Sequence, residues 1–318
     1  MLVSVAIALI ATATPLIGQT FGVYTSTTSN SGNNFAAATD YRAPTQNRSV
    51  IAKSAGGTPG FIKQGGTYFV YADLIDTGSP ASGISSVTSD SSSVTTGATA
   101  TALSSGGFSE NGVSYSHRTA SLTANATLAA GTYTYTVTGT DAAGNTSTSS
   151  YTVTVDNTAP GGSDIQTANG GAMAGRPDQN DTITYTFSEP IDPNSILAGW
   201  TGSATSVVVR VNNGGLGNDT VTVFNSANTT QLPLGSVNLA RIDYTTANIT
   251  FGATGTASTM TQSGNSITVK LGTQSAAGTT ALGTGTMIWT PSATATDRAG
   301  NAESTANVTE TGAADKDF

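Results

Sequence analysis

The sequence contains no cysteine and only one histidine, His117. Without cysteine the chain can form no disulfide, no thiolate metal site and no cysteine nucleophile. With one imidazole it can form no multi-histidine metal site, and any Ser-His-Asp arrangement would depend on His117 alone. Residues 114–119 alternate as a β-strand does, so they predict a surface strand around His117 rather than a catalytic loop.

Charged residues are also scarce, at 9% of the chain, and they sum to a net charge of -8. No run of lysine or arginine interrupts this acidic character, so the surface should repel phosphate backbones, which argues against a nucleic-acid partner. The hydrophobic fraction is nevertheless 37%, with Gly at 37 positions, so the polar surface must come largely from Ser, Thr, Asn and Gly. This composition is typical of an extracellular β-protein.

An apolar run covers residues 2–17, too short to remain as a membrane span, and small residues follow it at Thr20 and Gly22. The pattern predicts a signal peptide over residues 1–22 with cleavage after Gly22. No Lys or Arg precedes the run, which leaves a buried N-terminal helix as the alternative. Residues 23–45, rich in Ser, Thr and Asn, are predicted to form an extended arm.

This leader and arm resemble the start of TasA/camelysin-type proteins, which carry SipW-dependent-type signal segments. The matching positions are Phe21, Gly22, Tyr24, Asn33, Phe35, Ala37 and Thr39. The resemblance covers residues 2–42 and implies export. It also implies that the arm could add a strand to a neighbouring subunit, as in filament-forming members of that family.

From Ser49 onward, short alternating runs separated by turn residues predict β-sandwiches. In the clearest of them, residues 131–141, Tyr133, Tyr135 and Val137 share one face and threonines occupy the other. A turn at residues 141–145 leads to a partner strand at 151–155, and Pro160 then ends the unit. No long helix is predicted after the leader; residues 192–198 have the pattern of one short turn.

The segment 131–160 resembles the last hairpin of bacterial immunoglobulin-like domains, and residues 182–193 resemble an entry strand of another immunoglobulin-like subtype. The turn at Asp141 recurs at Asp297, near the end of each half. The fold class is therefore predicted to be all-β, with two tandem immunoglobulin-like β-sandwiches behind the signal helix and arm. The predicted domains are residues 46–160 and 161–312, followed by a tail at 313–318.

The search for chemistry assigns no catalytic, cofactor-binding or metal residue. Glutamate is scarce, and Glu189 has the position of a strand-end residue rather than of a general acid. Calcium is the alternative, since Asp73 with Asp76 and Asp141 with Asp156 could supply oxygen ligands at sandwich ends. Covalent Lys-Asn cross-links occur in some bacterial surface sandwiches, and this chain offers four lysines for one: Lys53, Lys63, Lys270 and Lys316.

The sequence thus predicts a secreted, non-enzymatic structural or adhesion protein of the cell surface or extracellular matrix, without a permanent membrane anchor. Its expected partners are surface or matrix components, with self-association through the arm as a filament subunit. The alternative is a carbohydrate- or ligand-binding module, for which Trp200, Trp289 and the tyrosines would supply exposed stacking faces. Burial of both rings in a core would favour the structural function, and exposure would favour the alternative.

Overall fold

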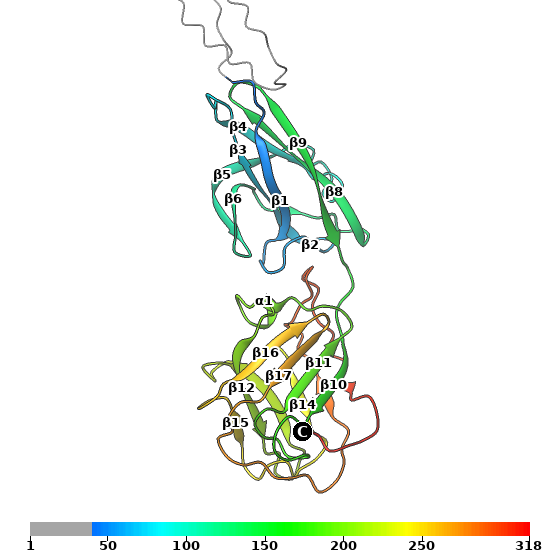
Figure 1. The fold of residues 1–318 in the computed structure, drawn as a ribbon. Coiled ribbons are helices and arrows are strands. Elements are labelled where there is room, and N and C mark those ends of the chain that lie inside the picture. The colour runs from blue at the N-terminus through cyan, green and yellow to red at the C-terminus, as the bar shows by residue number, and fades with distance from the viewer. Residues whose placement is uncertain (1–39) are drawn as a thin grey trace, which may run out of the picture. The chain divides into compact units, whose positions relative to one another are not determined.

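The computed structural model describes residues 40–318, which form an all-β structure with one short helix (Figure 1). The strands are β1 (Thr45–Lys53), β2 (Phe61–Ile62), β3 (Thr67–Ile75), β4 (Ile84–Asp90), β5 (Thr101–Glu110), β6 (Val113–Thr119), β7 (Leu122–Thr123), β8 (Gly131–Asp141), β9 (Thr146–Val155), β10 (Gly162–Ala168), β11 (Thr182–Phe187), β12 (Thr205–Asn212), β13 (Thr220–Asn225), β14 (Ser236–Asn238), β15 (Ile249–Phe251), β16 (Ser258–Ser263), β17 (Ser266–Lys270), β18 (Ile288–Thr290) and β19 (Val308–Thr309). The helix, α1, spans Pro193–Ile196.

The strands up to β9 form a first sandwich of two layers. One layer has the order β1-β3-β6-β5, with β7 beside β3, and the other has the order β4-β8-β9-β2. A short pairing of β4 with β5, at Thr88 with Ala102, joins the layers. The longest ladder is the β8–β9 hairpin, which pairs Gly131 with Val155 and continues to Thr140 with Thr146. The alternation in residues 131–141 therefore predicted this hairpin correctly.

The strands from β10 onward form a second sandwich, ordered β10-β11-β17-β16-β12-β13-β14-β18-β19, with β15 beside β12. All of the pairings between these strands are antiparallel. The single helix α1 begins after Asp192, whose side chain accepts a hydrogen bond from the Asn194 backbone N–H, and Pro193 occupies its first turn. It is only four residues long, as residues 192–198 predicted.

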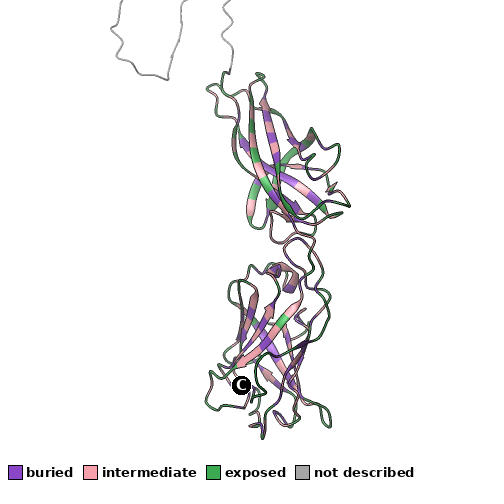
Figure 2. Ribbon diagram, turned by 90° about the vertical axis from the view of Figure 1, so that its right-hand side faces the viewer, coloured by how far each residue is buried: buried purple, intermediate pink, exposed green. Residues whose placement is uncertain are grey.

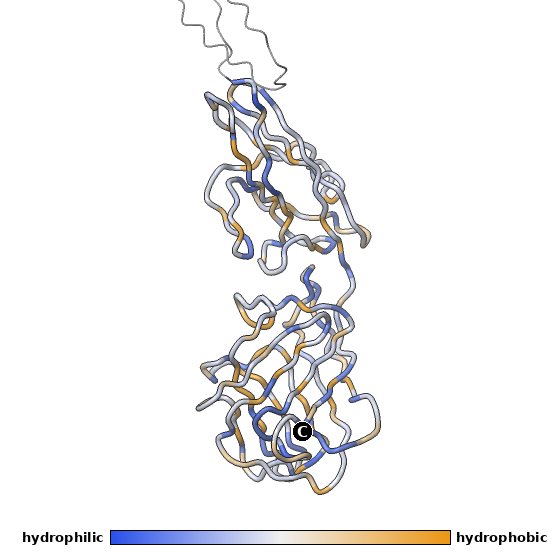
Figure 3. The backbone as a smooth tube through the Cα atoms, viewed as in Figure 1, coloured by the Kyte–Doolittle hydropathy of each residue, from blue (hydrophilic) through white to orange (hydrophobic). Residues whose placement is uncertain are grey.

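Each sandwich has its own hydrophobic core. Tyr68, Val70 and Tyr135 lie in the first core and are almost completely buried, and Tyr185 and Trp289 lie in the second. Figure 2 shows buried and less buried residues alternating along the strands, and Figure 3 shows hydrophobic positions interspersed with hydrophilic ones in both sandwiches. This period of two is what a sheet with one buried face requires, and it explains why the sequence predicted the fold class.

His117 lies in β6 as expected, but the surface position was wrong, since it is 8% exposed and burial lowers its pKa. The predicted tail, 313–318, packs onto the second sandwich. Asp315 forms an isolated antiparallel β-bridge with Gly285, and Asp317 accepts a hydrogen bond from the buried Tyr244 hydroxyl.

The predicted signal peptide and all but the end of the arm lie outside the described residues. Among residues 40–318, no helix has the length and apolar character needed to cross a membrane.

Candidate functional site

Carboxylates gather at one end of the first sandwich. Asp40 precedes β1, Asp76 follows β3 and Asp141 ends β8, and one oxygen of each lies within 4.8 Å of the others. Asp141 is fixed by Asn145, which donates its backbone N–H to Oδ1 and its side-chain amide to Oδ2, each at 2.8 Å. The same Asn145 amide donates to the Asp40 carbonyl at 3.2 Å. The turn therefore binds the segment before β1 to the end of β8.

The second sandwich repeats this arrangement with Asp156, Glu189 and Asp297, which also lie within 4.8 Å of one another. Asn301 donates to both Asp297 oxygens at 2.7 Å and to the Asp156 carbonyl at 2.9 Å. These bonds match those of Asn145 atom for atom. Both turns also contain a glycine with a φ of 91°, Gly144 and Gly300, which is a backbone conformation that favours glycine.

The segments that precede the two sandwiches correspond as well. Asp40 accepts a hydrogen bond from the Arg42 N–H at 2.9 Å, and Asp156 accepts one from the Thr158 N–H at 3.0 Å, two residues on in both cases. The sequence contains Asp-x-x-Ala-Pro at both places, residues 40–44 and 156–160. Each sandwich thus carries an equivalent acidic triad, built from an entry Asp, a carboxylate after the second long strand, and the Asp of the Asp-x-Ala-Gly-Asn turn.

The electrostatics of the triads differ. Backbone hydrogen bonds from Arg42 and Ser82 hold the pKa of Asp40 below its usual value. In the second triad, burial together with the charges of Asp156 and Asp297 raises the pKa of Glu189 to about 7. Its Oε1 atom is buried and has no hydrogen-bond partner among the described residues. A cation at this position would satisfy that oxygen and reverse the repulsion.

The structure regroups the aspartates that the calcium alternative named. Asp141 and Asp76 belong to the same triad, and the third member of that triad is Asp40. Asp156 belongs to the other triad. Asp73 lies outside both triads. Its carboxylate accepts a hydrogen bond from Asn47 and forms an ion pair with Arg48. Sequence reasoning missed Asp40 and Glu189 as partners. The signal for Asp40 was present in the repeated Asp-x-x-Ala-Pro pentapeptide.

Three carboxylates and a neighbouring backbone carbonyl are the oxygen ligands that Ca²⁺ prefers. We therefore expect millimolar calcium to raise the melting temperature, with a gain of about 1–3 kcal/mol when calcium exceeds its dissociation constant 10- to 100-fold. Asp141→Asn and Asp297→Asn should each remove part of the gain, and the double variant all of it. Calorimetry with calcium and with EDTA measures the effect.

Asp73→Asn is the matched control for this experiment, because Asp73 is an aspartate of the same sandwich that lies outside the triad. Its calcium response should equal that of the wild type. A wild-type melting temperature that is the same in calcium and in EDTA would show that the triads are structural turns and bind no cation.

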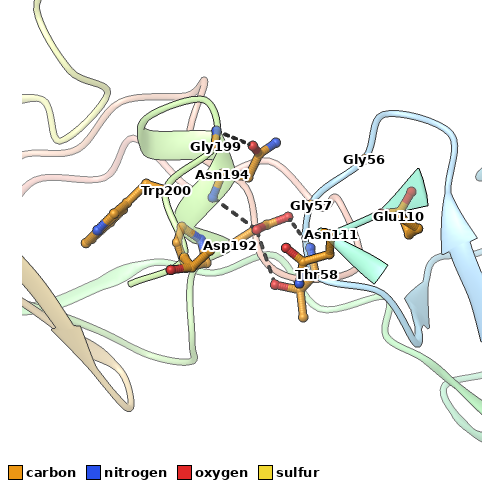
Figure 4. Close-up of a pocket in the computed structure, with 12 residues that line it drawn as sticks. Gly56, Gly57, Thr58, Glu110, Asn111, Asp192, Asn194, Gly199 and Trp200 are labelled. Carbon is orange, nitrogen blue, oxygen red and sulfur yellow. Dashed lines mark hydrogen bonds between the residues drawn. The ribbon is translucent and has the colours of Figure 1, made fainter. Parts of the chain in front are cut away.

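A separate polar cavity of about 490 Å³ is lined by residues of both sandwiches, among them Thr58, Glu110 and Asp192 (Figure 4). Trp200 also contributes to its wall, yet this side chain is only 6% exposed and its Nε1 donates to the Ser203 carbonyl. Trp289 is completely buried. Both tryptophans are thus core residues, as the structural interpretation of the sequence predicted.

Residues 73–157 match a bacterial Ig-like domain family. The match spans β4 to β9 of the first sandwich, including Asp76, Asp141 and the turn between β8 and β9. No curated protein matches the chain. This match to part of the chain agrees with the all-β sandwich fold and suggests a surface or extracellular module of a generally non-enzymatic class.

Proposed function

We propose that this chain is an exported, non-enzymatic structural module of the cell surface or extracellular matrix. The observation that carries the proposal is the burial of both tryptophans, at 6% and 0% exposure. Flat aromatic rings that bind sugars must present a face to the ligand, whereas these rings pack inside the second sandwich. The carbohydrate-binding alternative therefore loses its two tryptophans as stacking faces.

The match to bacterial Ig-like domains supports the same conclusion from the first sandwich. Two sandwiches with separate cores form a stable spacer, because each sandwich buries its own apolar side chains without a partner protein. Adhesion or polymerisation would then use the outer surfaces and the N-terminal arm. The match to bacterial Ig-like domains and the predicted signal peptide both support the proposed location outside the cell.

The N-terminal arm allows two parts of this proposal to be tested, namely export by cleavage and polymerisation through strand addition. The chain recovered from the medium or the cell surface should begin at Val23, as mass spectrometry would measure.

If the arm adds a strand to a neighbouring subunit, electron microscopy should show polymers, and deletion of residues 23–39 should abolish them while leaving the melting temperature of the monomer unchanged. A deletion variant with a destabilised monomer, and no polymer in either form, would contradict strand exchange. Recovery of intact Met1 from the medium would contradict export through cleavage.

A further inference from the structure

A lysine and a carboxylate lie in direct contact beside the polar cavity. Lys53, the last residue of β1, places Nζ 2.5 Å from Oδ2 of Asp192, the residue that caps α1. The two side chains are 11% and 2% exposed, which makes this the most buried ion pair within residues 40–318. The other three pairs in this range use arginine, whose guanidinium stays protonated, whereas a lysine amine becomes a nucleophile once it loses a proton.

Asp192 is held in a fixed position by several donors. Its Oδ1 accepts hydrogen bonds from the Asn194 N–H at 3.2 Å and from the Thr58 hydroxyl at 3.3 Å, and its Oδ2 accepts one from the Thr58 N–H at 3.3 Å (Figure 4). Gly57 allows this approach, because a Cβ atom there would collide with the Asp192 carboxylate. Donors directed at Oδ1 would stabilise a negative charge that develops on that oxygen.

A second carboxyl group faces the same cavity. Glu110 ends β5, is 8% exposed and lines the cavity together with Asp192. Burial raises the pKa of Glu110, and the carboxyl also interacts electrostatically with both Lys53 and Asp192. A carboxyl in this position can both accept and give a proton during a reaction at its neighbours.

We propose that Lys53 and Asp192 join in an isopeptide bond, so that a covalent cross-link connects β1 of the first sandwich to the start of α1. The amine and the carboxylate are already in contact, and such proximity replaces the encounter that a free amine and acid would need. The bond would close a loop across a sequence separation of 139 residues.

The reaction balances without an oxidant or co-reactant. Lys53 first passes one proton to Asp192 Oδ2 along the hydrogen bond between them. The neutral Nζ then attacks Cγ, a C–N bond forms, and negative charge collects on Oδ1, where Asn194 and Thr58 donate. Glu110 accepts a proton from the nitrogen and delivers it to Oδ2. The C–Oδ2 bond breaks, water leaves into the cavity, and Glu110 returns to its starting state.

Intact-mass measurement of the purified, folded chain tests the proposal. The wild type should be lighter than its sequence by one water molecule. Trypsin should leave Lys53 uncleaved and give a branched peptide that joins residues 49–63 to residues 119–210, since Arg176 precedes a proline. A wild-type mass equal to that of the sequence, with cleavage after Lys53, would overturn the cross-link and leave an ion pair only.

Variants identify the reacting groups. Lys53→Arg keeps a cation beside Asp192 and should restore the full mass. Asp192→Asn should lose ammonia instead of water, which distinguishes this carboxyl from any other acceptor. Glu110→Gln should slow the mass loss, as a time course after refolding would measure. Lys63→Arg is the matched control, because Lys63 donates to the Gly300 carbonyl and not to a carboxylate, so this variant should keep the wild-type mass loss.

Discussion

Replacing Glu303 with glutamine is expected to raise the free energy of unfolding at pH 8 and to flatten its dependence on pH. Glu303 is 4% exposed, and neither of its carboxyl oxygens has a hydrogen-bond partner among the described residues. Burial alone raises the pKa of this group to about 8. Glutamine has nearly the same shape and carries no charge, so it removes the cost of ionisation while filling the same space.

The sign of this pH dependence follows from the protonation of Glu303 in the folded and in the unfolded chain. At pH values below 4.5, the ordinary pKa of this carboxyl, it is protonated in both the folded and the unfolded chain. Between 4.5 and about 8 the unfolded chain releases the proton and the folded chain keeps it, so stability falls as pH rises. The total loss is about 3–5 kcal/mol, since each unit of pKa difference corresponds to about 1.4 kcal/mol.

Urea unfolding at several pH values between 4.5 and 8 measures the difference. Tryptophan fluorescence reports on the second sandwich, since both tryptophans lie there. A residual slope should remain in Glu303→Gln, because burial raises the pKa values of Glu189 and Asp317 to about 7. Asp243→Asn is the control: the hydrogen bond from Arg241 lowers the pKa of Asp243, so this variant should lose the same amount of stability at every pH between 4.5 and 8, and its curve should run parallel to that of the wild type. Parallel stability curves for Glu303→Gln and the wild type would contradict the prediction.

The sequence predicted the strands well where one face of a sheet is buried. In β8, Tyr135 and Val137 are almost completely buried while Thr136 between them is half-buried, which is the alternation visible in the sequence. A local period of two carries this information, because neighbouring side chains on a strand point to opposite faces. Burial that depends on distant residues has no such local signal. His117 and Glu303 are buried for that reason, and neither position was predictable.

The acidic triads were half predictable. The Asp-x-Ala-Gly-Asn turns and Asp156 are visible as sequence motifs, and the repeat of Asp-x-x-Ala-Pro would have added Asp40 and moved the start of the first sandwich ahead of residue 46. Glu189 has no motif in common with Asp76, and only the fold brings each beside its turn. The contact of Lys53 with Asp192 spans 139 residues and depends wholly on how the chain folds.

Trp289→Ala is expected to unfold the second sandwich while the first stays folded. Trp289 is completely buried, its ring lies edge-on to Tyr185 and Phe187 with centroids 5.3 and 5.1 Å away, and its Nε1 donates to the Leu234 carbonyl at 2.7 Å. Truncating such a side chain costs about 3–5 kcal/mol, a large share of the stability of one domain.

The two halves should respond separately because their cores share no residue. Amide signals of the first sandwich, followed by NMR, should persist in Trp289→Ala, and signals from residues after the predicted boundary near Pro160 should collapse into the unfolded range. Leu216→Ala is the control, because Leu216 is fully exposed and its loss should change neither half. Simultaneous loss of both sets of signals would show that residues 40–318 unfold as one cooperative unit, and the division near Pro160 would then be wrong.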